Sequence, residues 1–206
     1  MNNITSEFAA WLAAGGYRVG EVAIASLPGG GYRLTHWEEA TRADLTRYTV
    51  PEDARAIAMY DDAGEFRPLK TAPSLRRGWA LELPDLPALV RALDYFYPAA
   101  LGVWHAWKQG RLQRVPLRDT LERQTGMYAV TKKATDEEIN RVVARCCNSE
   151  GGCLKTILWE ISPGNPVRSL PAGKFSPPEP WFPLLCNEGC NLLVGAIRAE
   201  VKKDDE

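Results

Sequence analysis

The sequence predicts an α+β fold, with a strand-rich N-terminal part packed on a smaller, mostly helical domain. Three observations indicate this organisation. Short apolar runs separated by glycine-containing turns fill the first half, and apolar residues at helical spacing dominate the middle and the end. All five cysteines lie between positions 146 and 190. We therefore expect two domains, an α+β stabilising domain over residues 1–126 and a cluster-binding domain over residues 127–206.

The N-terminal part is predicted to begin with a helix that leads into a hairpin. Residues 7–14 form a short apolar helix, which Gly15-Gly16 would end as a C-cap. Strands are expected at 17–26 and 32–37, because Pro28-Gly29-Gly30-Gly31 between them is a hairpin signal.

A second hairpin is predicted around Asp61-Asp62-Ala63-Gly64, which is rich in turn-forming residues. Its strands would cover residues 56–60 and 65–68. The apolar run at 79–83 predicts one further strand.

Helices are predicted for the middle of the chain. Pro84-Asp85 precedes residues 86–96, in which apolar side chains recur at helical spacing. Pro98 interrupts this pattern, and further helices are expected over 99–108 and 117–124.

The last third combines two helices with a long loop. A brief strand is expected at 128–130. Thr135 and Glu138 have the spacing of a capping box, so a helix should begin there. Residues 162–183 hold seven prolines and two glycines, which predicts a stiff surface loop. A final helix is expected over 191–201.

Composition excludes several classes of function. The formal net charge is -1 and the isoelectric point is near 6.2, so a nucleic-acid partner, which needs a surplus of Lys and Arg, is not expected. No apolar run approaches the length of a membrane span, and the first residues lack the pattern of a signal peptide. We expect a cytoplasmic protein, in which clustered cysteines bind metal or do redox chemistry more often than they form disulfides.

Four of the cysteines form two close pairs, with the spacing Cys147-x5-Cys153 and Cys186-x3-Cys190. Two pairs joined by a loop can deliver four thiolates to one compact site, and a 4Fe-4S cluster needs one thiolate for each iron. A Cys-x3-Cys pair at a helix start would place both sulfurs near unpaired backbone amides, which lower thiolate pKa values. Gly151-Gly152 would let the backbone bend tightly before Cys153.

A resemblance to a known family follows from three segments. They are residues 123–128 (Arg-Gln-Thr-Gly-Met-Tyr), residues 146–159 and residues 186–193 (Cys-Asn-Glu-Gly-Cys-Asn-Leu-Leu). Over roughly residues 85–202 the chain resembles the iron–sulfur accessory domain fused to sirohydrochlorin and cobalt chelatases of the CbiX type. The cysteine spacing is also similar to that of sirohaem nitrite and sulfite reductases, which are much longer.

The resemblance implies a 4Fe-4S cluster held by the four paired cysteines, Cys147, Cys153, Cys186 and Cys190. It also implies a redox or regulatory role, with a chelatase or redox protein as the partner in sirohaem or cobalamin (tetrapyrrole) metabolism. Trp159 and Trp181 are expected to shield the cluster. The chain departs from the fused enzymes because it shows no chelatase domain: neither His36 nor His105 fits the chelatase pattern.

Two alternatives remain open for the cysteine site. A structural zinc ion also takes four thiolates, although its ligands usually lie two to four residues apart, and a zinc-stabilised interaction module is the second function. Cys146 falls in the middle of the apolar stripe of its helix and is expected to be a core residue. It can exchange roles with Cys147 because both reach the same site.

No catalytic residues are visible, because no Ser/His/Asp set, carboxylate pair or nucleotide motif stands out. The chain is therefore more consistent with a binding protein than with an enzyme. His105 lies between Trp104 and Trp107 and is expected to be a packed, hydrogen-bonded residue rather than a haem ligand. Arg123 and Lys132-Lys133 are expected to form a solvated charged face rather than a site for tetrapyrrole carboxylates.

Overall fold

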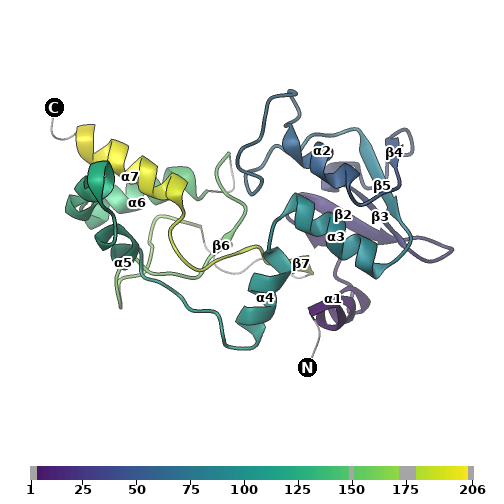
Figure 1. The fold of residues 1–206 in the computed structure, drawn as a ribbon, viewed down its shortest axis with the longest axis horizontal. Helices are drawn as coiled ribbons and strands as arrows, with labels where there is room; N and C mark the ends of the chain where they lie inside the picture. The colour runs from purple at the N-terminus through teal and green to yellow at the C-terminus, as the bar shows by residue number, and fades with distance from the viewer. Residues whose placement is uncertain (1–3, 149–150, 172–179, 204–206) are drawn as a thin grey trace. The chain divides into compact units, whose positions relative to one another are not determined.

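The computed structural model describes residues 4–148, 151–171 and 180–203, and it confirms the α+β class. The chain forms two compact units, drawn in Figure 1. The first comprises Met1–Gly110 and Pro177–Leu184, and the second comprises Arg111–Ser176 and Leu185–Glu206. The division lies near residue 110 rather than after residue 126, because the buried Leu117 and Leu121 belong to the core of the second unit.

A mixed sheet forms the centre of the first unit. Among the described residues it has six strands in the order β4-β5-β3-β2-β1-β7. The four central strands pair antiparallel, whereas β4 and β7 pair parallel to their neighbours at the two edges. The strands are β1 (Arg18–Val19), β2 (Val22–Ser26), β3 (Tyr32–His36), β4 (Thr46–Tyr48), β5 (Trp79–Leu83) and β7 (Trp181–Phe182).

The predicted hairpin at Pro28–Gly31 is confirmed, since β2 and β3 pair from Val22↔His36 to Ser26↔Tyr32. The predicted strand 17–26 is divided into β1 and β2 at Gly20. This glycine has a φ of +55°, and a Cβ there would lie 2.5 Å from the ring of Tyr97. The close approach of a buried tyrosine therefore requires glycine at the turn.

Four α-helices pack with this sheet: α1 (Ile4–Ala13), α2 (Asp53–Met59), α3 (Leu86–Phe96) and α4 (Ala100–Lys108). The helices predicted at 7–14, 86–96 and 99–108 are confirmed. Asp85 caps α3 by accepting a hydrogen bond from the Ala88 amide (2.9 Å).

The strand predicted at 56–60 is wrong, because most of these residues belong to α2. The short apolar segment is compatible with a helix as well as with a strand. In the helix, Ala54, Ile57 and Ala58 form an apolar face that is buried. The turn after α2 forms as predicted, with the Asp61 amide donating to the Glu65 carbonyl (2.8 Å).

Strand β7 was not predicted, because it lies inside the proline-rich segment 162–183. Residues 172–179 of that segment lie outside the described residues. Arg18 of β1 pairs with Trp181, and the ring of Phe182 packs within 4.8–5.6 Å of the rings of Phe8, Trp11 and Trp104. An aromatic core residue from late in the sequence thus completes the first unit.

The second unit is mostly helical. Its elements are α5 (Leu117–Glu122), the 3₁₀ helix η2 (Gly126–Lys133), α6 (Asp136–Cys146), α7 (Asn191–Lys203), and the paired strands β6 (Thr156–Ile157) and β8 (Leu185–Cys186). Helices α6 and α7 lie side by side (Figure 1). Ile139, Val142 and Val143 of α6 and Ile197 of α7 are fully buried in one core.

Two local predictions for this unit have different outcomes. The capping box is confirmed, since Thr135 accepts from the Glu138 amide and the Glu138 carboxylate accepts from the Thr135 amide. The strand predicted at 128–130 is wrong. Residues 126–133 are a 3₁₀ helix, in which the Thr131 hydroxyl donates to the Tyr128 carbonyl (2.8 Å).

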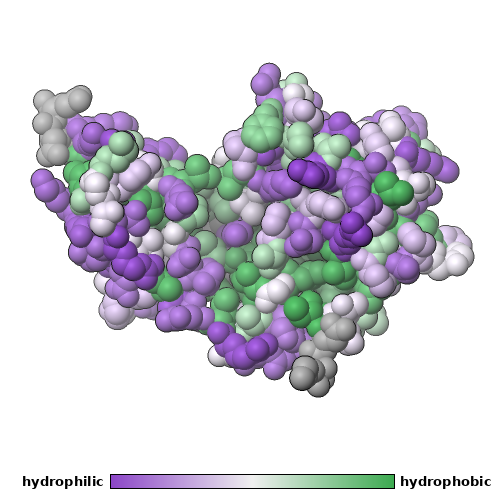
Figure 2. Space-filling view, viewed as in Figure 1, coloured by the Kyte–Doolittle hydropathy of each residue, from purple (hydrophilic) through white to green (hydrophobic). Residues whose placement is uncertain are grey.

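On the face drawn in Figure 2, hydrophilic side chains cover most of the helical unit, and apolar residues appear between them in smaller groups. Among the helices of the described residues, none combines the length and the apolar character needed to cross a membrane.

Candidate metal centre

Each of the four paired cysteines lies at the end of an element or in a turn of the second unit. Cys147 is the C-cap of α6, and its amide donates to the Val143 carbonyl (2.9 Å). Cys153 follows the Gly151-Gly152 turn. Cys186 ends β8, and Cys190 immediately precedes α7, where its carbonyl accepts from the Val194 amide (3.0 Å).

The second pair differs from its prediction in one respect. Both sulfurs were expected at one helix start, but Cys186 belongs to a strand. Cys186 pairs with Ile157 of β6, and its carbonyl accepts from the Leu158 amide (2.9 Å). Between the two cysteines, Gly189 lies close to Leu117 of α5, so that a Cβ there would come within 2.6 Å of the leucine side chain. The Cys186–Cys190 segment is thus held by β6 on one side and by α5 on the other.

Electrostatic interactions show that the thiols share one neighbourhood. Burial raises the pKa of the Cys147 thiol, and the thiols of Cys153, Cys186, Cys190 and Cys146 raise it further, in that order. Burial is also the main cause of the raised pKa of Cys186, to which Cys153 and Cys190 contribute. Thiolates placed together repel one another, so this donor set is stable as thiolates only when cations neutralise it.

Among the described residues, no group of three or more His, Cys, Asp or Glu side chains is arranged so that it could hold a metal ion.

Within the described part of the chain, hydrogen-bond donors point at the sulfurs of Cys186 and Cys153. Trp159 Nε1 donates to Cys186 Sγ (3.3 Å), and the Lys155 amide donates to Cys153 Sγ (3.4 Å). The Trp159 bond and the positive charge of Lys155 both oppose the rise in the pKa of Cys186. Such donors stabilise the charge of cluster ligands, so the residues present fit a 4Fe-4S cluster. The contribution of Lys155 was not predicted, although its place two residues after a cysteine was a usable signal.

The turn before Cys153 needs both glycines, as predicted. Gly151 has a φ of +80°, a conformation that L side chains rarely adopt. At Gly152 a Cβ would lie 2.2 Å from the Asn148 carbonyl oxygen and 2.9 Å from the Cys146 carbonyl oxygen. The backbone therefore folds back on the end of α6.

Cys146 and Cys147 are both half-buried, and both pack against the core of the second unit. The expected core contact of Cys146 is present, but Cys147 shares it. Cys190 is the exposed member of the set.

The two tryptophans expected beside the cluster have different positions. Trp159 is 3 % exposed and contacts Cys186, as expected. Trp181 instead belongs to the first unit, where its ring lies 3.8 Å from the Arg18 guanidinium and its Nε1 donates to the Tyr17 hydroxyl (3.2 Å). Pairing with β1 directs Trp181 to the sheet of the first unit, and its expected place beside the cluster stays a prediction.

We expect Trp159→Phe to lower the reduction potential of the cluster. A hydrogen bond to a ligand sulfur stabilises the more negative, reduced state, so its loss favours the oxidised state. A bond worth about 0.5–1 kcal/mol corresponds to about 20–40 mV for a one-electron couple. Protein-film voltammetry measures this shift, and an unchanged or raised potential would contradict the assignment of this bond.

The other residues weighed in the sequence have local partners. His105 Nδ1 lies 2.9 Å from Glu7 Oε2, which confirms a packed, hydrogen-bonded histidine. Arg123 faces Glu188 at 3.7 Å, with both side chains more than half exposed. Lys132 and Lys133 are exposed, as expected for a solvated face.

Comparisons with known proteins match two successive parts of the chain to two protein families. Residues 4–108 match the family model described as the DR2241 stabilising domain, and residues 109–199 match that of a 4Fe-4S iron-sulfur cluster binding domain. The cofactor of the second unit is therefore a 4Fe-4S cluster, and the zinc alternative is not supported. No curated protein matches the chain.

One solved structure is similar over nearly the whole chain. It is DR2241 from Deinococcus radiodurans, described as a multi-domain protein with structural similarity to chelatases and with two additional novel domains. The two chains are 32% identical, with a TM-score of 0.76. The alignment covers 98% of this chain and 42% of DR2241, so this chain spans less than half the length of that relative.

Proposed function

Because the chain belongs to the family of the DR2241 stabilising domain, we propose that it is an iron–sulfur protein with a redox or regulatory role beside a chelatase of tetrapyrrole metabolism. The observation that supports this proposal most directly is the order of the two domain matches, which follow one another without a gap at residues 108 and 109. The solved relative carries the counterpart of both domains in a chain that also resembles chelatases. The partner is a chelatase or a redox protein in the cytoplasm.

The proposed ligand set keeps the two close pairs of the sequence. Cys147 is included because the thiols of Cys153, Cys186 and Cys190 all raise its pKa, which indicates that it lies near the three of them. Each thiolate would hold one iron, so every iron of the cluster would have a protein ligand and no iron would be free to bind a substrate. The proposed ligands are Cys147, Cys153, Cys186 and Cys190.

When bound, the cluster supplies one-electron exchange. The residues around it would set its potential and access: Trp159 covers the Cys186 sulfur, and the Lys155 amide donates to Cys153. Cys190 is exposed, so the cluster would be open to solvent or to a partner on that side. The proposed cluster site therefore has one side with hydrogen-bond donors and one side, at Cys190, that is open. Such a site suits a cluster that exchanges electrons with its surroundings.

The proposal is tested by metal insertion in the presence of this chain. Cobalt insertion into sirohydrochlorin by a purified CbiX-type chelatase is measured with the oxidised chain, the reduced chain, and the cluster-free Cys153→Ser variant. We expect the rate to depend on the presence and the redox state of the cluster. Equal rates in all three mixtures would contradict the chelatase-linked role but leave the cluster itself unaffected.

Elemental analysis after anaerobic purification supplies the necessary control for this assay. A brown protein with four irons and four sulfides per chain is expected from the cofactor. A colourless protein with one zinc ion per chain would instead favour an interaction module, and the redox proposal would fail.

A further inference from the structure

Three aromatic side chains surround Arg18 at one end of the sheet in the first unit. Tyr17 precedes β1 and Arg18 begins it, whereas Trp37 opens the 3₁₀ helix η1 (Trp37–Glu39) after β3 and Trp181 belongs to the edge strand β7. The Arg18 guanidinium lies over both indole rings, 4.0 Å from that of Trp37 and 3.8 Å from that of Trp181. Segments distant in the sequence therefore build one aromatic surface around a single cation.

The Arg18 guanidinium has few partners for a buried cation. Arg18 is 9% exposed, and its one hydrogen bond in the described part of the chain runs from Nε to the Gly20 carbonyl (2.8 Å). The flanking indoles offer no acceptor, because an indole N–H is a donor only. The Nη groups are not among the buried side-chain atoms that lack a partner, so this edge of the guanidinium reaches the surface. Arg18 therefore presents unfilled N–H donors to the outside.

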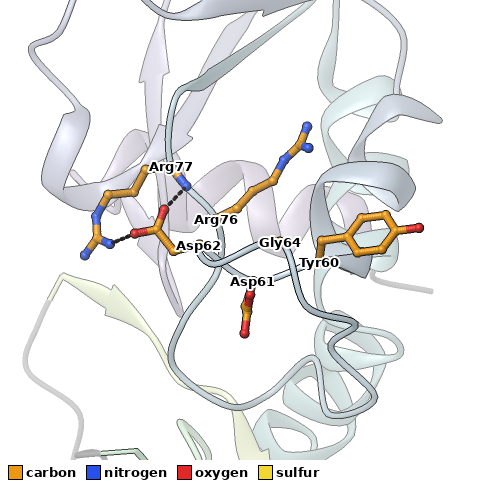
Figure 3. Close-up of a pocket in the computed structure, with 6 residues that line it drawn as sticks. All are labelled: Tyr60, Asp61, Asp62, Gly64, Arg76 and Arg77. Carbon is orange, nitrogen blue, oxygen red and sulfur yellow. Dashed lines mark hydrogen bonds and ion pairs between the residues drawn. The ribbon is translucent and has the colours of Figure 1, made fainter.

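Carboxylates of the first unit act on Arg18 only from a distance. Burial lowers the pKa of Arg18, and the groups that oppose this change include Glu21 and Glu38. Glu21 accepts from two backbone amides and faces Arg67 at 3.5 Å. Glu38 is paired with Arg77, whose other ion pair Figure 3 shows on the wall of a separate pocket. Both carboxylates are thus held by other groups, and the donors of Arg18 stay available to an acceptor from outside.

The aromatic side chains beside this cation are open to solvent. Tyr17 is 46% exposed and Trp37 is 41% exposed, while Trp181 is half-buried and donates from Nε1 to the Tyr17 hydroxyl (3.2 Å). Exposed apolar groups that gather on a soluble domain mark interaction sites, and Trp, Tyr and Arg carry most of the binding energy at protein interfaces. The composition of this surface is therefore that of a protein contact.

We infer that this surface, formed by Tyr17, Arg18, Trp37 and Trp181, docks a segment of a partner protein that presents an aspartate or glutamate between apolar residues. The carboxylate would accept from the Nη edge, whose planar geometry suits two parallel hydrogen bonds. The apolar neighbours of the carboxylate would cover Tyr17 and Trp37.

A carboxylate is favoured over a neutral acceptor by the surroundings of the guanidinium. The indoles shield the cation from water, and a charge-assisted hydrogen bond gains strength where water is excluded. The rings also hold the guanidinium in place, so little side-chain entropy is lost on binding. This inference does not depend on the proposed function, because it uses neither the cluster nor a chelatase.

The test uses the complete, cluster-loaded chain and a blocked tripeptide with glutamate between two leucines. The same peptide with glutamine is the neutral analogue, and acetate is the small carboxylate. The indole N–H resonances of Trp37 and Trp181 report on binding, since both rings contact Arg18. We expect saturable shifts with the glutamate peptide, and weaker binding of the glutamine peptide and of acetate.

Two variants and a matched control complete the design. Arg18→Gln should weaken the glutamate peptide about tenfold or more, as the loss of charged hydrogen bonds predicts, and should remove the preference for glutamate. Trp37→Ala changes an exposed side chain and should weaken both peptides while the preference remains. Arg91→Gln removes an exposed arginine that pairs with Glu52 in another part of the unit, and should bind as the wild type does.

The inference is overturned if the glutamate peptide does not saturate, if the glutamine peptide binds equally well, or if Arg18→Gln keeps the preference. Acetate that binds as tightly as the glutamate peptide would overturn the assignment to a protein partner. If Arg18→Gln does not fold, Arg18→Lys keeps the charge without the planar fork: a reduced affinity supports the inference, and an undiminished one overturns it.

Discussion

Replacing Cys153 by serine is expected to abolish cluster binding. In the proposed ligand set each thiolate holds one iron, and a serine hydroxyl stays protonated at neutral pH, so it does not replace a thiolate. Iron and sulfide content should fall to background, and the visible absorption of the cluster should disappear. Because the cations that neutralise the remaining thiolates are lost with it, residues 147–190 should also become more open to proteolysis.

Cys146→Ser is the matched control for this change. Cys146 is the neighbour of a proposed ligand and packs against the same core, yet it holds no iron in the proposal. This variant should keep its full iron and sulfide content, with at most a small loss of stability. The ligand set would have to be revised if Cys146→Ser lost the cluster, or if Cys153→Ser retained four irons.

A methyl group at Gly152 is expected to be almost as harmful as the loss of a ligand. The added Cβ would lie 2.2 Å from the Asn148 carbonyl oxygen, and backbone cannot move aside as the end of a side chain can. The turn would have to open, which moves Cys153 away from Cys147. We expect Gly152→Ala to lose most of its cluster and to be destabilised by about 1–3 kcal/mol, the usual range for overpacking. Metal analysis and urea denaturation measure the two effects.

Gly151→Ala is the control for Gly152→Ala, because it introduces backbone strain without the steric clash. A Cβ at Gly151 meets nothing within 4 Å, but the φ of +80° makes alanine unfavourable there by about 1–2 kcal/mol. The variant should be destabilised yet keep most of its cluster. If the two alanine variants lost the cluster equally, the clash with Asn148 would not be the cause.

The sequence predicted those elements whose signals are local. The helix α3 has both an N-cap residue and apolar residues at helical spacing, and the capping box of α6 requires only two side chains three residues apart. The segment 56–60 was misread because a short apolar run fits a buried helix as well as a strand. Strand β7 could not be predicted, since two residues among prolines become a strand only by pairing with β1, more than 160 positions earlier.

For the metal centre, the chemistry of the donors was predictable and their surroundings were not. Cysteine spacing and the resemblance led to the 4Fe-4S cluster, which the family model confirms. The ligand assignment itself remains a prediction. Trp159 was expected near the cluster and does contact Cys186, whereas the pairing of Trp181 with β1 could not be predicted.

The position of β7 has a consequence for the order of events during synthesis. Because the ribosome makes the chain from its N-terminus, the sheet of the first unit waits for Trp181 and Phe182 before its last strand can be added. By then Cys147 and Cys153 have already been made, and Cys186 follows β7 by only four residues. The nascent chain therefore completes its sheet and acquires its last two cysteines within a few elongation steps. Iron delivered much earlier would meet only the thiols of Cys146, Cys147 and Cys153.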